Sequence, residues 1–326
     1  PGVQAAAVAR EPAVLAACKH QPPPRPNFRN FPRPAAPSAH YHVAAIPDVI
    51  AAGQHWKIIW HTRGNNADGI VGTPDGDILI AQNSNSDVVK LTPRGHASIV
   101  YQDTDTGGAL SMNKQGQLFI DERGLNASIW ELSPQHKVLA NRYDGGSFDC
   151  IGGVLNDLTA AANGGVYFTQ GFGGGVFYAS PEGVVTQYGH DLRTNGIILS
   201  PDEKTLYVTN AGTLVAFDVQ PGGALTNQHV LATLPGGGGD GATVDAAGRI
   251  YVTGFPGVRV VSSDGTVIGT IPAPVQLISV AFSGPDKKTL FAVGELRSNK
   301  PGIAGIASAE ILAIPMIAQG YRGRAK

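Results

Sequence analysis

Side chains with oxygen donors recur at one position of a repeated motif. The motif spans about fourteen residues and occurs six times, and its copies begin at Asp68, Gly108, Asn156, Asn195, Asp240 and Ser279. Two carboxylates and two amides provide only oxygen ligands, which suit hard divalent cations; Ca²⁺ is favoured, with Mg²⁺ or Mn²⁺ as substitutes. No cysteine or histidine occupies the position, which argues against zinc and copper. The pattern predicts one metal site formed by Asp68, Asn156, Asn195 and Asp240.

Loop capping is the alternative explanation for these four side chains. Asn and Asp often accept hydrogen bonds from nearby backbone amides in turns, with no metal involved. For any one residue this explanation is the more common one. The recurrence at a single repeat position favours a shared site over four separate caps.

The elements that must position these residues are short strands. Each copy reads as a strand, a turn containing Gly or Asp, and a second strand rich in Leu, Ile, Tyr and Val. Successive copies start 40, 48, 39, 45 and 39 residues apart. This period, with several strands per unit, is typical of β-propeller blades. We therefore predict an all-β fold, a six-bladed β-propeller of four-stranded blades, in which each copy starts the innermost strand at one end of the central channel.

One strand precedes the first copy and has no partners of its own. It covers Trp56–His61. Propellers remove their exposed sheet edge by pairing an N-terminal strand into the last blade. We predict that this strand closes the ring beside Ala309–Ile314.

Residues 1–50 differ in composition from the repeats. They are predicted to form an N-terminal extension, while residues 51–326 form the propeller.

Charge and hydropathy exclude two classes of protein. The formal net charge is −1 and no basic stripe is interleaved with aromatic residues, so a nucleic-acid partner is not expected. No apolar run approaches the roughly 18 residues of a membrane span.

Two cysteines, Cys18 and Cys150, lie far apart in the sequence. They are either unrelated thiols or a disulfide that ties the extension to the loop before the third copy. A disulfide persists in an oxidising compartment. A secreted or periplasmic location is slightly favoured over the cytoplasm.

Several residues near the expected channel mouth are candidates for substrate contact. Arg123, with Glu122 beside it, follows the strands of the second copy and could hold a carboxylate or carbonyl oxygen; an ordinary ion pair in a solvated loop is the alternative. His190 precedes the fourth copy and is either a proton relay or an ordinary loop histidine. Asp157 either orients a ligand or stabilises a turn. The glycine run Gly236–Gly239 is expected to let the backbone approach an ion or substrate closely.

With these residues laid out, the chain resembles the gluconolactonase and senescence marker protein (regucalcin-like) family of six-bladed propeller lactonases. The resemblance runs from about residue 55 to 322. It is carried by Leu155–Leu158 (LNDL), Thr194–Ile197 (TNGI), Leu199–Asp202 (LSPD), Lys204–Val208 (KTLYV), Asp240–Asp245 (DGATVD), Val280–Phe282 (VAF), Gly284–Asp286 (GPD) and Lys288–Leu290 (KTL).

The resemblance implies a divalent ion, often calcium, held by a Glu of the first blade, two Asn and an Asp. Asn156, Asn195 and Asp240 match the last three positions. Asp68 stands where the family usually has Glu and is one methylene shorter, which leaves ligation through water or no ligation open. Arg123 matches the family's substrate-binding Arg only loosely.

The resemblance also implies hydrolysis of a lactone, a cyclic ester. An ion at the mouth would polarise the ester carbonyl. Asp240 is then the expected catalytic residue, either as a base for the attacking water or as a nucleophile that forms an acyl intermediate. The alternatives are a calcium-dependent phosphoester hydrolase resembling diisopropyl fluorophosphatase or the paraoxonases, a metal-free enzyme like strictosidine synthase, and a non-catalytic binding propeller.

Overall fold

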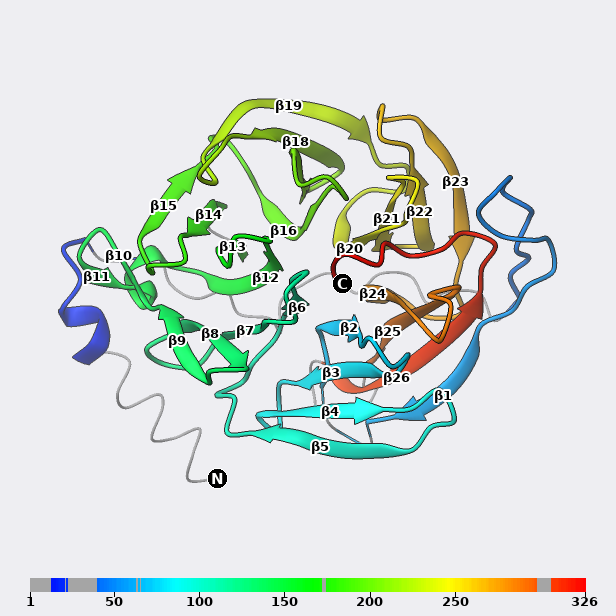
Figure 1. Ribbon diagram of the computed structural model, residues 1–326, viewed down its shortest axis with the longest axis horizontal. Helices are drawn as coiled ribbons and strands as arrows, with labels where there is room; N and C mark the ends of the chain where they lie inside the picture. Colours follow the sequence, from blue (N-terminus) through cyan, green and yellow to red (C-terminus); the bar gives the residue numbers. More distant parts are fainter. Residues whose placement is uncertain are drawn as a thin grey trace.

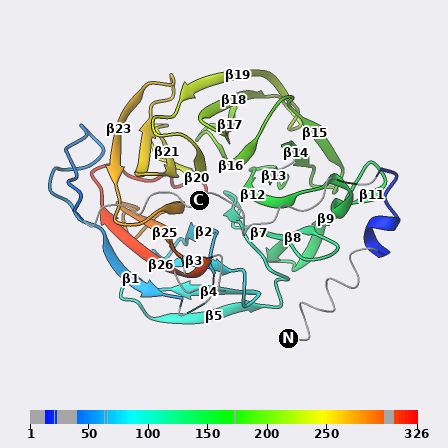
Figure 2. The ribbon, with the colours of Figure 1, turned by 180° about the vertical axis from the view of Figure 1, so that it is seen from behind.

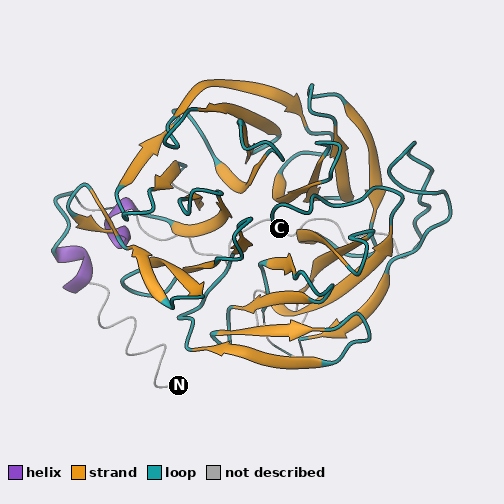
Figure 3. Ribbon diagram, in the orientation of Figure 1, coloured by secondary structure: helices purple, strands orange, loops and turns teal. Residues whose placement is uncertain are grey.

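The computed structural model describes residues 13–20, 22, 40–62, 64, 66–171, 174–297 and 306–326. Six four-stranded antiparallel sheets are arranged in a ring, and each has its first strand nearest the central axis, apart from a small extra hairpin (Figures 1 and 3). The predicted all-β, six-bladed propeller is confirmed.

The strands of each blade follow one another outwards from the channel. They are β2 (Ile70–Gly72), β3 (Ile78–Gln82), β4 (Asp87–Leu91) and β5 (Ala97–Gln102) in blade 1; β6 (Leu110–Met112), β7 (Leu118–Glu122), β8 (Ser128–Ser133) and β9 (Lys137–Ala140) in blade 2; β12 (Val154–Ala160), β13 (Val166–Gly171), β14 (Val176–Ala179) and β15 (Val185–Tyr188) in blade 3; β16 (Thr194–Leu199), β17 (Thr205–Asn210), β18 (Thr213–Val219) and β19 (Leu225–Thr233) in blade 4; β20 (Gly239–Val244), β21 (Ile250–Gly254), β22 (Gly257–Val261) and β23 (Val267–Pro272) in blade 5; and β24 (Leu277–Ser283), β25 (Thr289–Arg297), β26 (Ile306–Pro315) and β1 (Lys57–His61) in blade 6.

The core consists of layers between neighbouring blades. Strands in the middle of a blade, such as β3, β14 and β22, are buried at every position, whereas the outermost strands β5 and β15 have exposed residues. Each middle strand is covered on both faces by adjacent blades, so its sequence is apolar nearly throughout. Phe119, Phe168 and Phe177 form part of one such layer. Burying a side chain of this size contributes about 1.5–3 kcal/mol.

The ring is closed as the sequence predicts. Strand β1 pairs antiparallel with β26, with His61 opposite Glu310 and Lys57 opposite Ala313. Blade 6 therefore combines strands from the two ends of the chain. The outer edge of the last blade is the N-terminal strand, drawn in blue beside the red β26 (Figure 1).

Part of the segment before β1 packs on the propeller. Val43, Ile46, Val49 and Ile50 are buried in one apolar cluster with residues of blades 5 and 6. The indole N–H of Trp56 donates to the carbonyl of Pro272, 2.9 Å away. These contacts cover the side of the ring next to its closure. In the described ranges no helix has the length and apolar character needed to cross a membrane.

Cys18 and Cys150 form a disulfide. Cys150 belongs to the 3₁₀ helix η2 (Phe148–Ile151), which follows the small hairpin of β10 (Arg142–Tyr143) and β11 (Gly146–Ser147). Lys19 donates to the Asp144 carbonyl at 2.9 Å and adds a polar contact beside the bond. Of the two alternatives left open by the sequence, the disulfide is the correct one.

The disulfide predicts a stability difference between oxidised and reduced protein. It closes a sequence separation of 132 residues, so it removes many conformations from the unfolded chain. We expect the Cys18→Ser variant to lose about 2–4 kcal/mol of unfolding free energy in urea titrations. Reductant should produce the same loss in the wild type and have no effect on the variant. Equal stability of oxidised and reduced wild type would contradict this.

The segment after β26 turns back to the centre of the ring. Gly320 forms an isolated bridge with Asp245, and Ala325 forms another with Met112. The C-terminus lies at the middle of the ring when the molecule is seen from either side (Figures 1 and 2). The chain thus ends against the innermost strands.

Candidate functional site

The four proposed metal ligands lie at equivalent places in four blades. Asn156, Asn195 and Asp240 are near the first residue of the innermost strands β12, β16 and β20, and Asp68 comes just before β2. The innermost strands of neighbouring blades contact one another around the ring. Because they run in the same direction along the channel, their first residues gather at one end of it.

Glycine after the ligand position allows this convergence. A side chain at Gly69 would overlap the Gly108 carbonyl oxygen, and one at Gly196 would overlap the carbonyl oxygen of Asp240. Neighbouring innermost strands therefore approach backbone to backbone at these two points. The Asp-Gly and Asn-Gly dipeptides of the motif serve both to place an oxygen donor and to bring the next blade close.

Arg123 connects three blades at this end of the channel. Its Nη1 lies 2.6 Å from Asp68 Oδ2, its Nε lies 3.0 Å from Asp121 Oδ2, and Nη2 donates to the carbonyl of Asn156. Asp121 is fully buried and also accepts hydrogen bonds from the amides of Gly108 and Ala109. Burial raises the pKa of Asp121 to about 6, although Arg123 opposes this shift.

Asp240 has no such counter-ion. No described residue donates a hydrogen bond to its carboxylate. Burial, followed by the negative charges of Asp68, Glu295 and Asp157, raises its pKa well above the ordinary value, and Arg123 opposes this shift. A divalent cation beside Asp240 would offset both burial and repulsion.

The two amides complete a donor set that suits such a cation. The side chains of Asn156 and Asn195 have no hydrogen-bond partner in the described part of the chain; the recorded contacts involve their backbone carbonyls. Within the described ranges no three His, Cys, Asp or Glu side chains gather as a metal site. A metal site at this mouth therefore depends on amide oxygens, which the Asn residues can provide. The residues present fit a hard, oxygen-binding ion.

Asp157 turns to the other side of its strand and meets a lysine. Its Oδ1 pairs with the ammonium of Lys326, and its Oδ2 accepts the backbone N–H of Ile197 at 2.9 Å. Burial raises the pKa of Asp157, and Lys326 opposes that shift. Of the two roles considered for Asp157, the geometry fits an orienting group, because it joins the strands that carry Asn156 and Asn195.

The glycine run before Asp240 is organised by a buried arginine that sequence reasoning missed. Arg259, on β22, is fully buried and donates to the carbonyls of Pro235, Gly237 and Gly238 at 2.9, 2.6 and 2.8 Å. It also reaches the Thr253 carbonyl at 3.3 Å. These carbonyls turn toward Arg259, so the run shapes the approach to Asp240. The available signal was an arginine within an otherwise apolar strand, Gly257–Val261.

Glu295 is another residue absent from the sequence prediction. It lies on β25 and is close enough to Asp240 to raise the pKa of that carboxyl. Its position falls just after the end of the sixth motif copy, so the repeat itself does not include it. Acidic groups outnumber basic groups at this mouth, which favours cations.

Glu122 and His190 are less closely associated with the ligands. Glu122 accepts a hydrogen bond from Ser128 Oγ at 3.1 Å, and burial raises its pKa. The backbone of His190 bonds to Gln228, and His190 lines a cavity of about 290 Å³ with Gly174 and Asp191. None of the four proposed ligands lines this cavity. A substrate role for Glu122 or His190 stays a prediction.

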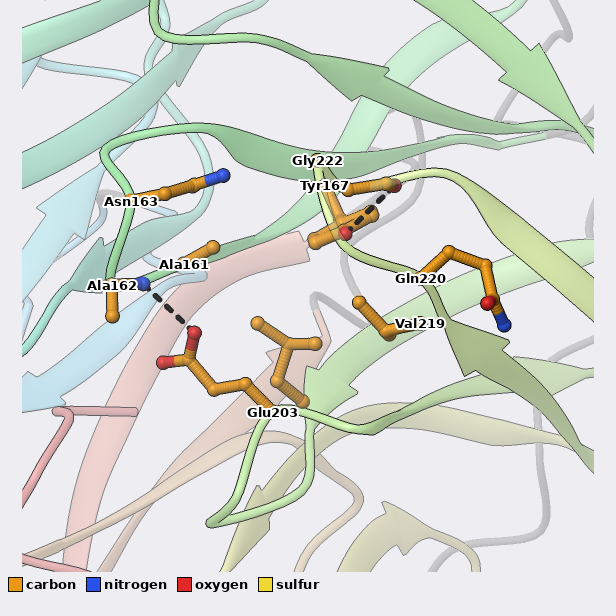
Figure 4. Close-up of a pocket in the computed structure, with 10 residues that line it drawn as sticks. Ala161, Ala162, Asn163, Tyr167, Glu203, Val219, Gln220 and Gly222 are labelled. Carbon is orange, nitrogen blue, oxygen red and sulfur yellow. Dashed lines mark hydrogen bonds between the residues drawn. The ribbon is translucent and has the colours of Figure 1, made fainter.

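A second cavity, of about 250 Å³, lies at the ends of β12 and β16 that are opposite Asn156 and Asn195. Figure 4 shows it between the turns that follow β12 and β16, with Glu203 accepting a hydrogen bond from the amide of Ala162. Tyr167 forms its wall and donates to the carbonyl of Gly223 at 2.8 Å. Because Asn156 and Asn195 begin these strands, the cavity is separate from the candidate site.

Two lactonases are similar in sequence to this chain over most of its length. Gluconolactonase of Zymomonas mobilis is 26% identical over 287 residues, which cover 75% of this chain and 77% of that protein. Lactonase drp35 of Staphylococcus saprophyticus is 26% identical over 258 residues, or 72% of this chain and 76% of the relative.

Solved structures share the fold. A gluconolactonase from Xanthomonas campestris superposes with a TM-score of 0.68 at 22% identity, covering 88% of this chain and 99% of that one. Regucalcin of Agrobacterium tumefaciens, described as a calcium-binding protein, gives a TM-score of 0.61 at 21% identity, covering 78% and 93%. Residues 105–293 match the family model described as the SMP-30/Gluconolactonase/LRE-like region, which is more than half of the chain. The chain therefore belongs to the SMP-30/gluconolactonase/LRE-like family.

Proposed function

We propose that this protein is a hydrolase that opens the ring of a lactone. The family and the lactonase relatives support the reaction class. The observation that carries the proposal for the site is the half-buried Asp240 carboxylate, which has no described hydrogen-bond partner and lies at the same end of the channel as two asparagine amides without partners in the described chain. Residues 51–326 would form the hydrolase domain, and residues 1–50 would form its N-terminal extension.

Asp240, Asn156 and Asn195 would hold a divalent ion, with Ca²⁺ favoured by the all-oxygen donor set. Asp68 would be the fourth ligand. Its Oδ2 is paired with Arg123, so Oδ1 is the atom through which it would bind, directly or through water. A bound divalent ion would make the lactone carbonyl more electrophilic. The calcium-binding description of the fold neighbour regucalcin supports this choice.

Asp240 would act either as the base that activates water or as the nucleophile itself. As a base, it takes a proton from a water whose oxygen bonds to the carbonyl carbon; the ring C–O bond then breaks, and the ring oxygen receives a proton to give a hydroxy acid. Direct attack by Asp240 would give an acyl intermediate that water then hydrolyses. Arg123 donates three hydrogen bonds to described residues, and a guanidinium has five N–H groups. Its remaining N–H groups would bind substrate oxygens at the mouth.

Lactone hydrolysis before and after metal removal tests this proposal. We expect aldono-, γ-, δ- or aromatic lactones to release acid in a pH-stat, with turnover lost after chelation and restored by Ca²⁺. A metal assay must show that the chelator emptied the site. Full activity of the metal-free protein would overturn the metal mechanism.

A phosphotriester in the same panel covers the alternative reaction. Hydrolysis of the phosphotriester with no lactone turnover would replace the lactonase proposal with phosphoester hydrolysis. A metal-loaded protein that hydrolyses neither substrate class would favour a binding propeller.

A further inference from the structure

A lysine ammonium lies inside the channel, directly behind the candidate site. The Lys326 side chain is 1% exposed and pairs with Asp157 Oδ1. Its Nζ also donates to the carbonyls of Leu158 and Ile197, at 3.0 and 3.1 Å. The ammonium is therefore surrounded by three oxygens from the innermost strands of blades 3 and 4. A buried charge of this kind is costly unless it is paired and fully hydrogen-bonded.

The segment that carries Lys326 is anchored along its length. Arg324 is buried and donates to the carbonyls of Leu199 and Ser200, and its Nη1 lies 3.3 Å from Glu203, which lines the cavity in Figure 4. Ala325 exchanges backbone hydrogen bonds with Met112 at 3.1 and 2.9 Å.

Two further side chains, from blades 5 and 6, bind the same segment. Lys287 donates to the carbonyls of Tyr321 and Arg324, at 3.0 and 3.3 Å. Thr243, on β20, donates to the carbonyl of Lys326. These anchors fix the direction in which the lysine side chain enters the channel.

The ammonium acts on the candidate site through Asp157. One oxygen of Asp157 binds Lys326 and the other binds the amide of Ile197, so the carboxylate joins β12 to β16. Asn156 is the residue before Asp157, and Asn195 lies two residues before Ile197. Asp157, held by Lys326, therefore links the backbone next to Asn156 to the backbone near Asn195.

We propose that Lys326 is a built-in channel cation and a positioning residue: it fixes Asp157 and thereby sets the spacing of Asn156 and Asn195. In its absence the same three oxygens would form a site for a small monovalent cation, such as ammonium or K⁺. One carboxylate and two carbonyls match a single positive charge. The link to Asn156 and Asn195 as ligands rests on the proposed function, whereas the monovalent site does not.

The test uses Lys326→Ala and Lys326→Met in the full-length protein. Titration of the metal-free protein with Ca²⁺ by calorimetry should show affinity lowered 10–100-fold in both variants, the range seen when groups supporting a ligand are removed. Ammonium chloride should restore affinity in Lys326→Ala. It should not restore it in Lys326→Met, whose side chain fills the space. Lys288→Ala removes an exposed lysine and should match the wild type.

Thermal unfolding provides a readout that does not depend on the proposed reaction. The Tm of Lys326→Ala should rise with ammonium chloride and not with tetramethylammonium chloride, because the larger ion cannot enter the site. The wild-type Tm should respond equally to both salts. Equal responses of Lys326→Ala to both salts would overturn the monovalent site.

A double variant keeps the test valid if the single variants fail to fold. Asp157→Asn with Lys326→Met removes both charges and leaves no unpaired ion in the channel. Its Ca²⁺ affinity should still fall at least tenfold, and unchanged affinity would overturn the positioning role. If the wild type itself binds no Ca²⁺, the proposed metal site fails, while the Tm measurements still decide on the monovalent site.

Discussion

The Asp240→Asn variant should lose kcat/KM for lactone hydrolysis by about 10²–10⁴-fold, the contribution expected of a positioned proton acceptor. Asparagine keeps the shape of the side chain but cannot take a proton from water or act as a carboxylate nucleophile. Steady-state kinetics in saturating Ca²⁺ measures the effect, and the exposed Asp286→Asn serves as the matched control.

The same substitution should not destabilise the metal-free protein. Asp240 is half-buried and is repelled by the charges of Asp68, Glu295 and Asp157, so removing its charge relieves repulsion. We expect the Tm of metal-free Asp240→Asn to equal or exceed that of metal-free wild type. Lost activity with a retained Tm would show that Asp240 acts in the reaction and is not needed for stability. Activity within threefold of the wild type would exclude Asp240 as the catalytic residue.

The Arg259→Met variant should lose roughly 1–3 kcal/mol of unfolding free energy, because the buried guanidinium no longer donates to four backbone carbonyls. Since three of them belong to the segment leading to Asp240, hydrolysis should fall as well. Urea unfolding measures the first effect, and lactone kinetics under stabilising conditions measure the second.

Two further variants define the cause of the Arg259 effect. Arg259→Lys keeps the charge but cannot span four carbonyls, so its stability should lie between wild type and Arg259→Met. Arg94→Met changes an exposed arginine and should alter stability by less than about 0.5 kcal/mol. If Arg259→Met were as stable as Arg94→Met, Arg259 would not stabilise the glycine run through its hydrogen bonds.

The fold was predictable because every blade repeats the same pattern. The strand–turn–strand copies indicate the ring and its innermost strands, and the unpartnered strand before the first copy indicates the closure with β26. The position of Asp68, Asn156, Asn195 and Asp240 at one end of the channel follows from the same repeat. Their role as ligands stays a proposal.

The supporting groups were not predictable because they lie outside the repeat or contradict its pattern. Lys326 follows the last strand, so no period indicates that it returns to the channel. Arg259 occupies a strand position that is apolar in other blades, and its partners are backbone carbonyls, which have no sequence signature. The Cys18–Cys150 disulfide depends on where residues before the propeller lie, which spacing alone does not determine.

The closure of the ring has a consequence for how the chain is made. His61 pairs with Glu310, so β1 leaves the ribosome roughly 250 residues before its partner strand exists. At 5–20 residues per second, this is a wait of about 12–50 s with an exposed strand edge. Residues 306–326 bring both the missing strand and the channel lysine. Closure of the ring and assembly of the channel interior therefore both wait for residues 306–326, and a nascent chain that stops before β26 retains an open strand edge.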